Sequence, residues 1–268
     1  MAMVWLNGDL LEEKEARLFV TDRGFTLADG IFETMRAVKM MPYWFTEHFE
    51  RLTAGAAELG FSVPFSEHVF GDAIHQLLLE SAAPAESAIR LTVTRGPAAA
   101  RGLWPTENSS RPTCLLTVAR AIPPHPQDFV ICKSTRRNEY SPLARIKSLS
   151  YGDNILARRE AIGRGVGDAI MLNTKGNIAC ATVGNVFFRV AGRWMTPSSA
   201  DGILPGLARR RLLKEVDAVE APLSIEAIMR ADAGFVSNSL GCTQIKSIDG
   251  HALSGDLTDL PISSVYSP

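Results

Sequence analysis

ARIKSLSYGDN, residues 144–154, places Lys147 between an apolar residue and a run of small polar ones. The overlapping stretch YGDNILARREAIGRG (151–165) has the composition of a helix and stops at a glycine, as many helices do. A lysine just before such a helix is either a covalent nucleophile, whose desolvated amine loses its proton easily, or an ordinary solvated loop lysine. The local sequence by itself favours the ordinary interpretation.

Strand and helix patterns precede this segment. Residues 87–96 and 112–121 are rich in β-branched and apolar side chains, which predicts two strands. Thr46 is expected to cap the helix EHFERLTAGAAEL, and Ser66 the helix EHVFGDAIHQLLLESA. The polar, Pro-rich stretch 97–111 is predicted to be a long loop, of a kind that often carries function.

The C-terminal side of the chain is richer in strands. Turn signals at Lys175-Gly176 and Ala191-Gly192 lie between apolar runs and predict paired strands. Three prolines in AIPPHPQD mark a change in composition and a domain boundary. The expected fold is α+β, with a small N-terminal α/β domain and a larger strand-rich C-terminal domain. The expected parts are residues 1–120, a linker at 121–128, and residues 129–268.

Composition excludes several classes of protein. Of 268 residues, 46% are apolar, and 28 basic residues nearly balance 29 acidic ones, which argues against disorder and against a dedicated nucleic-acid binder. No run approaches the roughly 18 apolar residues of a membrane span, and the opening segment lacks the pattern of a signal peptide. The four cysteines and five histidines show no metal-binding spacing. We therefore expect a soluble cytoplasmic protein without a metal.

Three features suggest sites for an anion. TEHFERL places His48 and Arg51 three residues apart on one helical face, so that Arg51 is able to grip a phosphate. GILPGLARR (202–210) puts a Pro-Gly pair at a helix start, where backbone N–H groups are exposed. FVSNSLG (235–241) runs from a strand into small polar residues. Each feature alone is also typical of ordinary surface structure.

Together, these features resemble the fold-type IV family of pyridoxal-phosphate enzymes, which includes D-amino-acid and branched-chain aminotransferases and aminodeoxychorismate lyase. The likeness runs through nearly the whole chain in a fixed order. Its motifs are DRGFTLADGIFETMR (22–36), HFERL (48–52), TRGPAAARGL (94–103), KSLSYGDNILARREA (147–161), GNIACATVGNVFF (176–188), GILPGLARRRLL (202–213) and FVSNSL (235–240). The ordered set is specific even though each motif is not.

The resemblance implies pyridoxal 5'-phosphate as cofactor, a small anionic amino-acid-like substrate and a homodimer. It implies that Lys147 binds the cofactor covalently and moves the proton, and that Arg51 binds the phosphate. Arg101 is either a substrate-carboxylate ligand or an exposed arginine without function. The other cofactor-binding positions that the resemblance implies are Tyr151, Asn154, Cys180, Leu207, Ala208, Ser239 and Leu240.

Cys180 departs from the family pattern. Members that resemble this chain usually read G-x-V-x-E here, and that glutamate pairs with the pyridine nitrogen, whereas this chain reads GNIACAT (176–182). A carboxylate keeps the ring nitrogen protonated and so helps the ring accept electrons. A neutral thiol does this poorly, which predicts weak or altered chemistry unless another group or water serves the nitrogen.

The sequence favours the lyase over the aminotransferases. Aminodeoxychorismate lyase eliminates pyruvate and leaves an aromatic ring, so that it has less need of strong electron withdrawal, which fits Cys180. Leu103 stands where the lyase usually has an aromatic residue and where D-amino-acid aminotransferases often have a histidine. The alternatives are an aminotransferase for D-amino or branched-chain amino acids and a cofactor-binding relative with little activity.

Overall fold

The computed structural model describes residues 2–99, 102–105, 111–258 and 260–266. The chain forms two compact units. The first comprises the chain up to Ile122 together with Ile146–Ser150, and the second comprises Pro123–Arg145 and the chain from Tyr151 onward. The break after Ile122 lies inside the predicted linker, whereas Ile146–Ser150 belongs to the first unit although the sequence placed it in the second domain.

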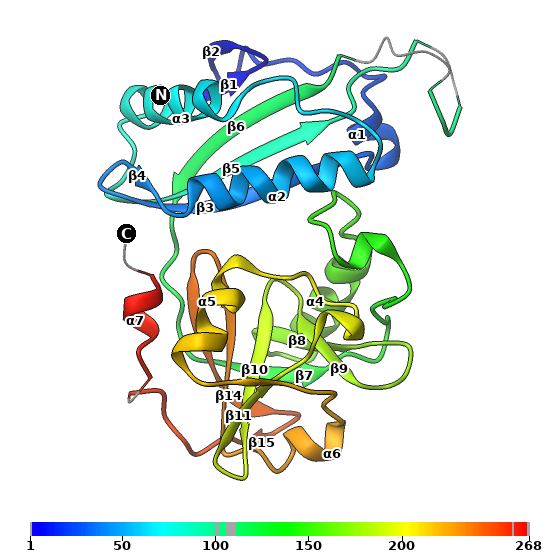
Figure 1. Ribbon diagram of the computed structural model, residues 1–268, viewed down its shortest axis with the longest axis vertical. Coiled ribbons are helices and arrows are strands. Elements are labelled where there is room, and N and C mark those ends of the chain that lie inside the picture. The colour runs from blue at the N-terminus through cyan, green and yellow to red at the C-terminus, as the bar shows by residue number, and fades with distance from the viewer. Residues whose placement is uncertain (1, 100–101, 106–110, 259, 267–268) are drawn as a thin grey trace. The chain divides into compact units, whose positions relative to one another are not determined.

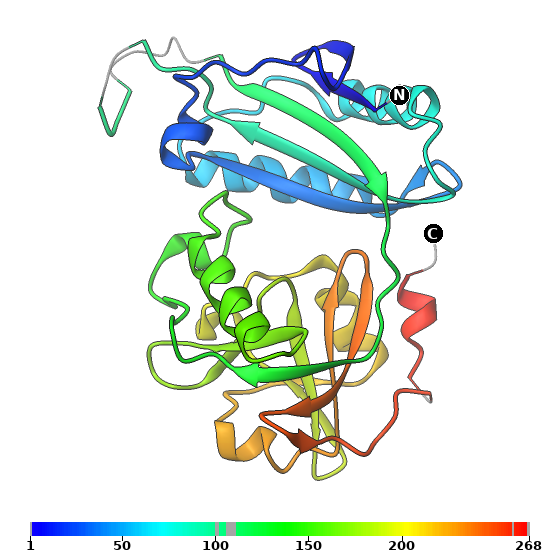
Figure 2. The ribbon, with the colours of Figure 1, turned by 180° about the vertical axis from the view of Figure 1, so that it is seen from behind.

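The first unit is an antiparallel sheet with the strand order β2-β1-β6-β5-β3-β4. Two long helices cover one face of this sheet, as the opposite views of Figures 1 and 2 show. Strands β1 and β2 pair antiparallel on either side of Asn7-Gly8, a dipeptide typical of tight hairpin turns. The elements are β1 (Met3–Leu6), β2 (Asp9–Glu12), α1 (Arg23–Leu27), β3 (Gly30–Val38), β4 (Met41–Pro42), α2 (Phe45–Glu58), α3 (Glu67–Glu80), β5 (Glu86–Thr94) and β6 (Thr113–Arg120).

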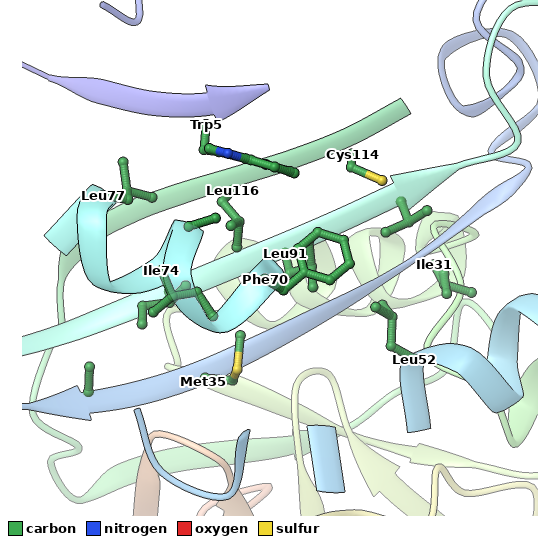
Figure 3. Close-up of a cluster of buried hydrophobic side chains, with 14 of the residues drawn as sticks. Trp5, Ile31, Met35, Leu52, Phe70, Ile74, Leu77, Leu91, Cys114 and Leu116 are labelled. Carbon is green, nitrogen blue, oxygen red and sulfur yellow. The ribbon is translucent and has the colours of Figure 1, made fainter. Parts of the chain in front are cut away.

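The core of this unit lies between the sheet and the helices. Alternate residues of a strand point to opposite faces, and Ile31 and Met35 of β3 both point into the core. Phe70 and Ile74 of α3 pack against them from the helix side (Figure 3). The Phe70 ring lies edge-on to Trp5, with 5.6 Å between ring centroids. This packing holds β3 rigidly in place.

Phe70→Ala is expected to lower the free energy of unfolding by about 3–5 kcal/mol, because it leaves a cavity in a fully buried aromatic cluster. Urea denaturation followed by circular dichroism measures the change. Val69→Ala, at the neighbouring exposed position of α3, is the control and is expected to change the free energy by less than about 0.5 kcal/mol. Equal effects of the two changes would contradict the assignment of the core.

Helix α2 begins earlier than the sequence predicts. Thr46 was expected to be the N-cap, but the cap is Trp44, whose φ of 57° is left-handed, and the helix starts at Phe45. The turn after β4 sets this start, and the Thr46 hydroxyl donates instead to Glu67 Oε1 at 2.6 Å. The predicted cap of α3 is confirmed, since Ser66 accepts from the Val69 N–H at 3.4 Å.

The second unit is built on a nine-stranded sheet with the order β12-β11-β10-β13-β14-β7-β8-β9, to which β15 adds by pairing with β14. The predicted turns at Lys175-Gly176 and Ala191-Gly192 join β8 to β9 and β10 to β11. The elements are β7 (Gln127–Ile131), α4 (Gly152–Gly163), β8 (Asp168–Leu172), β9 (Ile178–Ala181), β10 (Asn185–Val190), β11 (Arg193–Thr196), α5 (Leu207–Glu215), β12 (Val219–Glu220), α6 (Ile225–Ile228), β13 (Ala233–Asn238), β14 (Gly241–Ile248), β15 (His251–Ala252) and α7 (Ile262–Val265), with 3-10 turns at Pro142–Ala144 and Ser199–Asp201.

Strand β8 is buried on both faces. Ile170 and Leu172 belong to one apolar cluster with residues of β10 and β14. Met171, on the opposite face, packs with Ala157 and Ala161 of α4. A strand covered on both sides is expected to be apolar throughout, as in the sequence DAIML, apart from its first residue.

The predicted α+β class is confirmed, since strands outnumber helices in both units among the described residues. In the same part of the chain, none of the helices has the length and apolar character that crossing a bilayer requires.

Candidate active site

Lys147 lies on a short extended segment at the edge of β3. The Phe32 N–H donates to the Lys147 carbonyl at 2.9 Å, and the Leu149 N–H donates to the Gly30 carbonyl at 2.9 Å. Ile31 and Ser148 form an antiparallel bridge between these two bonds. The backbone of the lysine is therefore fixed by strand pairing, although its neighbours in sequence belong to the second unit.

The Lys147 ammonium faces an aromatic ring and a second cation. Lys147 Nζ lies 4.3 Å from the centroid of the Phe32 ring, and Arg90 Cζ lies 3.7 Å from the same centroid. Burial lowers the pKa of Lys147 to about 8; the charge of Glu33 opposes this shift, and the charges of Arg51 and Arg90 add to it. Roughly a tenth of the amine is unprotonated at pH 7 with such a pKa. The lysine is thus far better suited to nucleophilic and proton-transfer chemistry than a solvated one.

His48 and Arg51 bind one buried carboxylate, that of Glu33. Arg51 donates from Nε to Oε1 at 2.8 Å and from Nη2 to Oε2 at 2.6 Å, while His48 Nδ1 lies 2.7 Å from Oε2. Glu33 and His48 are each only 1% exposed. Burial raises the pKa of Glu33, but the charge and hydrogen bonds of Arg51 and the bond to His48 outweigh burial and hold it at about 2.

Three residues of this group were not predicted from sequence: Phe32, Glu33 and Arg90. For Glu33 a signal exists, because it has the same parity in β3 as the inward-pointing Ile31 and Met35. A carboxylate on a buried apolar face is stable only when other groups pair with it. The position of Glu33 therefore predicts a cationic side chain nearby. Arg90 becomes recognisable only through the register that places it opposite Thr34 of β3.

The loop after β5 is fastened to the start of β3 by arginines. Arg23 and Arg95 both donate from Nε to Asp29 Oδ2 at 2.7 Å. Arg23 also donates to the carbonyls of Gly102 (3.0 Å) and Leu103 (2.6 Å), which anchors this part of the loop. Arg101 lies outside the described residues, so its role stays a prediction.

In the second unit, the start of α4 is tied to the end of β9. Asn154 Nδ2 donates to the Thr182 carbonyl at 2.7 Å, and the Thr182 hydroxyl donates to Asp168 Oδ1 at 2.6 Å. Asn154 Oδ1 is buried and has no hydrogen-bond partner among the described residues. Tyr151, the residue before the first turn, is the N-cap of α4. The structure thus brings Asn154 next to the end of the strand that carries Cys180.

Cys180 lies on β9 opposite Met171 and is 7% exposed. Burial raises the pKa of its thiol; the charge of Arg137 opposes this shift and that of Asp168 adds to it. The side chain is therefore an uncharged thiol at neutral pH. Arg137 is held in place by donating to the carbonyls of Gly202 (3.2 Å) and Ala144 (3.0 Å).

The N-terminus of α5 has the features of an anion site. Gly206 is the N-cap, no side chain caps the helix, and its first turn contains no acidic residue. A Cβ at position 206 would collide with Asn185 Oδ1, so that the close approach of this side chain favours glycine. Asn185 in turn donates to the Leu204 carbonyl at 2.9 Å and fixes the approach to the helix. Leu207 and Ala208, the predicted phosphate contacts, form the first turn.

Ser239 and Leu240 form the turn between β13 and β14. The Leu240 N–H donates to Asn238 Oδ1 at 2.8 Å, and the Tyr266 hydroxyl donates to the Asn238 carbonyl at 2.8 Å. The Ser237 hydroxyl is buried and has no hydrogen-bond partner among the described residues. A phosphate contact by the Leu240 N–H would replace its bond to Asn238, and this contact stays a prediction.

Comparisons with known proteins identify the family of the chain. The model of the family "Amino-transferase class IV" matches residues 30–248. A putative branched-chain-amino-acid aminotransferase of Methanocaldococcus jannaschii is 31% identical, over 93% of this chain and 89% of its own. The aminodeoxychorismate lyase of Bacillus subtilis is 29% identical, over 96% of this chain and 91% of its own.

A solved structure has the same fold. The putative 4-amino-4-deoxychorismate lyase of Legionella pneumophila superposes with a TM-score of 0.84 at 28% identity, covering 92% of this chain and 93% of its own. The family match extends from β3, which carries Glu33, to the end of β14. The chain therefore belongs to the class IV aminotransferase family, the fold-type IV enzymes that use pyridoxal phosphate.

Proposed function

We propose that the protein is a pyridoxal-phosphate-dependent lyase that converts 4-amino-4-deoxychorismate to 4-aminobenzoate and pyruvate. The observation that carries the proposal is the uncharged thiol of Cys180 at the position where family members usually have a glutamate. The similarity to the Bacillus subtilis lyase over 96% of the chain supports it. The proposed catalytic residue is Lys147.

The residues of both units fit the cofactor. Lys147 offers a buried amine with a lowered pKa, and Arg51 offers a guanidinium held by Glu33. The uncapped start of α5 offers backbone N–H groups suited to a phosphate. When bound, pyridoxal phosphate supplies an electron-withdrawing ring. Lys147 Nζ would take up and return the substrate proton, and Arg51 would bind the phosphate.

Cys180 favours elimination over amino-group transfer. An aminotransferase must stabilise negative charge on the substrate until the proton has been moved, which a carboxylate near the ring nitrogen assists. In the lyase reaction, formation of the aromatic product supplies driving force of its own. A site with a neutral thiol at this position is therefore better matched to the lyase.

An aminotransferase for branched-chain or D-amino acids is the second candidate. The 31% identity to the putative branched-chain enzyme of Methanocaldococcus jannaschii favours it. A third candidate is a relative that binds the cofactor but has little activity, and the loss of the carboxylate at Cys180 favours that one. All three share the role of Lys147, so that the substrate assay separates them.

The deciding experiment supplies aminodeoxychorismate to the purified protein with pyridoxal phosphate. We expect 4-aminobenzoate and pyruvate in equal amounts, measured by chromatography and by coupled lactate dehydrogenase. Parallel reactions with D-alanine or leucine and 2-oxoglutarate test the aminotransferases. Turnover only in these parallel reactions would replace the lyase assignment, and cofactor binding without any turnover would establish the third candidate.

We further propose that the protein works as a homodimer in the cytoplasm. Large apolar side chains of the first unit are exposed, including Phe19, Val20 and Phe25 at 69–81% exposure, and such groups commonly mark subunit contacts. All four cysteines are unpaired, as is usual in a reducing compartment.

A further inference from the structure

We propose that Glu33 is a positioning residue that sets the orientation of the Arg51 guanidinium and, through its charge, the protonation of Lys147. The inference rests on the proposed binding of a pyridoxal phosphate by Arg51 and Lys147. The buried carboxylate of Glu33 would then act both on the phosphate-binding guanidinium of Arg51 and on the amine of Lys147.

The geometry of the pair fixes the plane of the guanidinium. Glu33 accepts two bonds from one edge of Arg51, the edge that carries Nε and Nη2. Such a side-on pair allows a single planar arrangement, because both carboxylate oxygens are engaged. A phosphate that binds Arg51 would then meet a guanidinium whose plane is set by the pair with Glu33 rather than by the flexible arginine stem.

His48 holds the carboxylate from the other side. Its Nδ1 lies 2.7 Å from Glu33 Oε2, and burial lowers the pKa of the imidazole, so that the ring is neutral and donates from Nδ1. His48 and Arg51 both come from α2, whereas Glu33 comes from β3. The carboxylate therefore connects the helix to the strand whose edge pairs with the Lys147 segment.

The charges around Lys147 come from three elements. Glu33 of β3 raises the pKa of the lysine, while Arg51 of α2 and Arg90 of β5 lower it. His48 is neutral, and the charge of Lys147 is one of the causes that lower its pKa. His48 and Lys147 therefore influence each other electrostatically. Glu33 is thus an anion whose charge favours the ammonium form of this lysine, against burial and the two arginines.

Two adjacent residues of β3 contact the two functional groups, one the amine of Lys147 and the other the guanidinium of Arg51. Phe32 presents its ring to Lys147 Nζ at 4.3 Å, and Glu33 presents its carboxylate to Arg51. Neighbouring side chains in a strand point to opposite faces, so that a two-residue segment reaches both groups. A change at Glu33 is therefore expected to affect Arg51 by contact and Lys147 only through charge.

The test uses Glu33→Gln in the full chain, with two measurements. The dissociation constant of pyridoxal phosphate is expected to rise about tenfold or more, as when a residue that orients a ligand-binding group is lost. In cofactor-free protein, the pH midpoint for labelling of Lys147 by acetic anhydride, read by mass spectrometry, is expected to fall by about one pH unit. The sign follows because removing an anion lowers the pKa of a neighbouring ammonium.

Asp72→Asn is the matched control, because Asp72 is an exposed carboxylate that pairs with His68 Nδ1 at 3.1 Å in the same unit. Neither measurement is expected to change in this variant. A folded Glu33→Gln protein in which either the dissociation constant or the labelling midpoint equals the wild-type value overturns the proposal.

Glu33→Asp keeps the proposal testable where Glu33→Gln fails to fold. Aspartate keeps the negative charge, but its side chain is one methylene shorter, which moves the carboxylate away from Arg51. We expect weaker cofactor binding with an unchanged labelling midpoint, and wild-type binding would overturn the positioning role. A wild-type protein that binds the cofactor at Lys147 but lacks lyase turnover would refute the proposed reaction and leave the role of Glu33 intact.

Discussion

Lys147→Ala is expected to reduce turnover of aminodeoxychorismate by at least about a thousandfold and to abolish the visible absorbance of the covalently bound cofactor. Both effects follow from one lost amine, since Lys147 is the proposed covalent attachment point and the proposed proton carrier. Its lowered pKa of about 8 suits both tasks near neutral pH. Absorbance spectra and the product assay on the same preparation measure the two losses together.

Lys175→Ala is the control for this change. Lys175 lies in the turn between β8 and β9, with Nζ 5.4 Å from the Tyr140 ring centroid, and has no proposed role in the reaction. Wild-type absorbance and turnover are expected. Retention of the visible absorbance in Lys147→Ala would refute Lys147 as the attachment point, even if turnover were lost.

Cys180→Glu is expected to raise the aminotransferase rate with D-alanine or leucine and 2-oxoglutarate by about tenfold or more. A carboxylate beside a nitrogen base shifts its pKa upward by roughly 1–3 units, which favours the protonated, electron-withdrawing ring. The charge of Arg137 acts on this position and would favour the ionised form of the introduced carboxylate, in opposition to burial and to the charge of Asp168. Initial rates at saturating cofactor measure the gain.

Cys180→Gln separates charge from size in this experiment. Glutamine has nearly the same shape as glutamate but carries no charge. No gain in the aminotransferase rate is therefore expected for Cys180→Gln. An unchanged or lower rate in a folded Cys180→Glu protein that binds the cofactor would show that another group serves the ring nitrogen.

The fold was largely predictable because its signals are local. Turn residues such as Asn7-Gly8 and Ala191-Gly192 separate apolar runs, and the strands pair as these turns predict. The start of α2 was not predictable from propensity, because the left-handed residue Trp44 depends on the preceding turn, and Thr46 is a good cap only by composition. The assignment of Ile146–Ser150 depends on pairing with a strand more than a hundred residues away.

The candidate site was predictable only in part. Lys147, Arg51 and the α5 start follow from the resemblance, and the structure adds what surrounds them. The bidentate partner of Arg51 and the ring beside Lys147 lie on β3, which no local motif around either residue indicates. Arg137, whose charge acts on Cys180, is distant in sequence from it and recognisable only through the folded second unit.

The position of Ile146–Ser150 determines which fragments of the chain contain a complete first unit. The chain passes between the two units three times, after residues 122, 145 and 150. A fragment that ends at 122 loses the segment that completes the edge of β3, and one that begins at 123 carries Lys147 without its sheet. Recombination at the linker would therefore bring together a lysine and a carboxylate from different ancestors. Residues on both sides of the linker are therefore needed to complete the first unit.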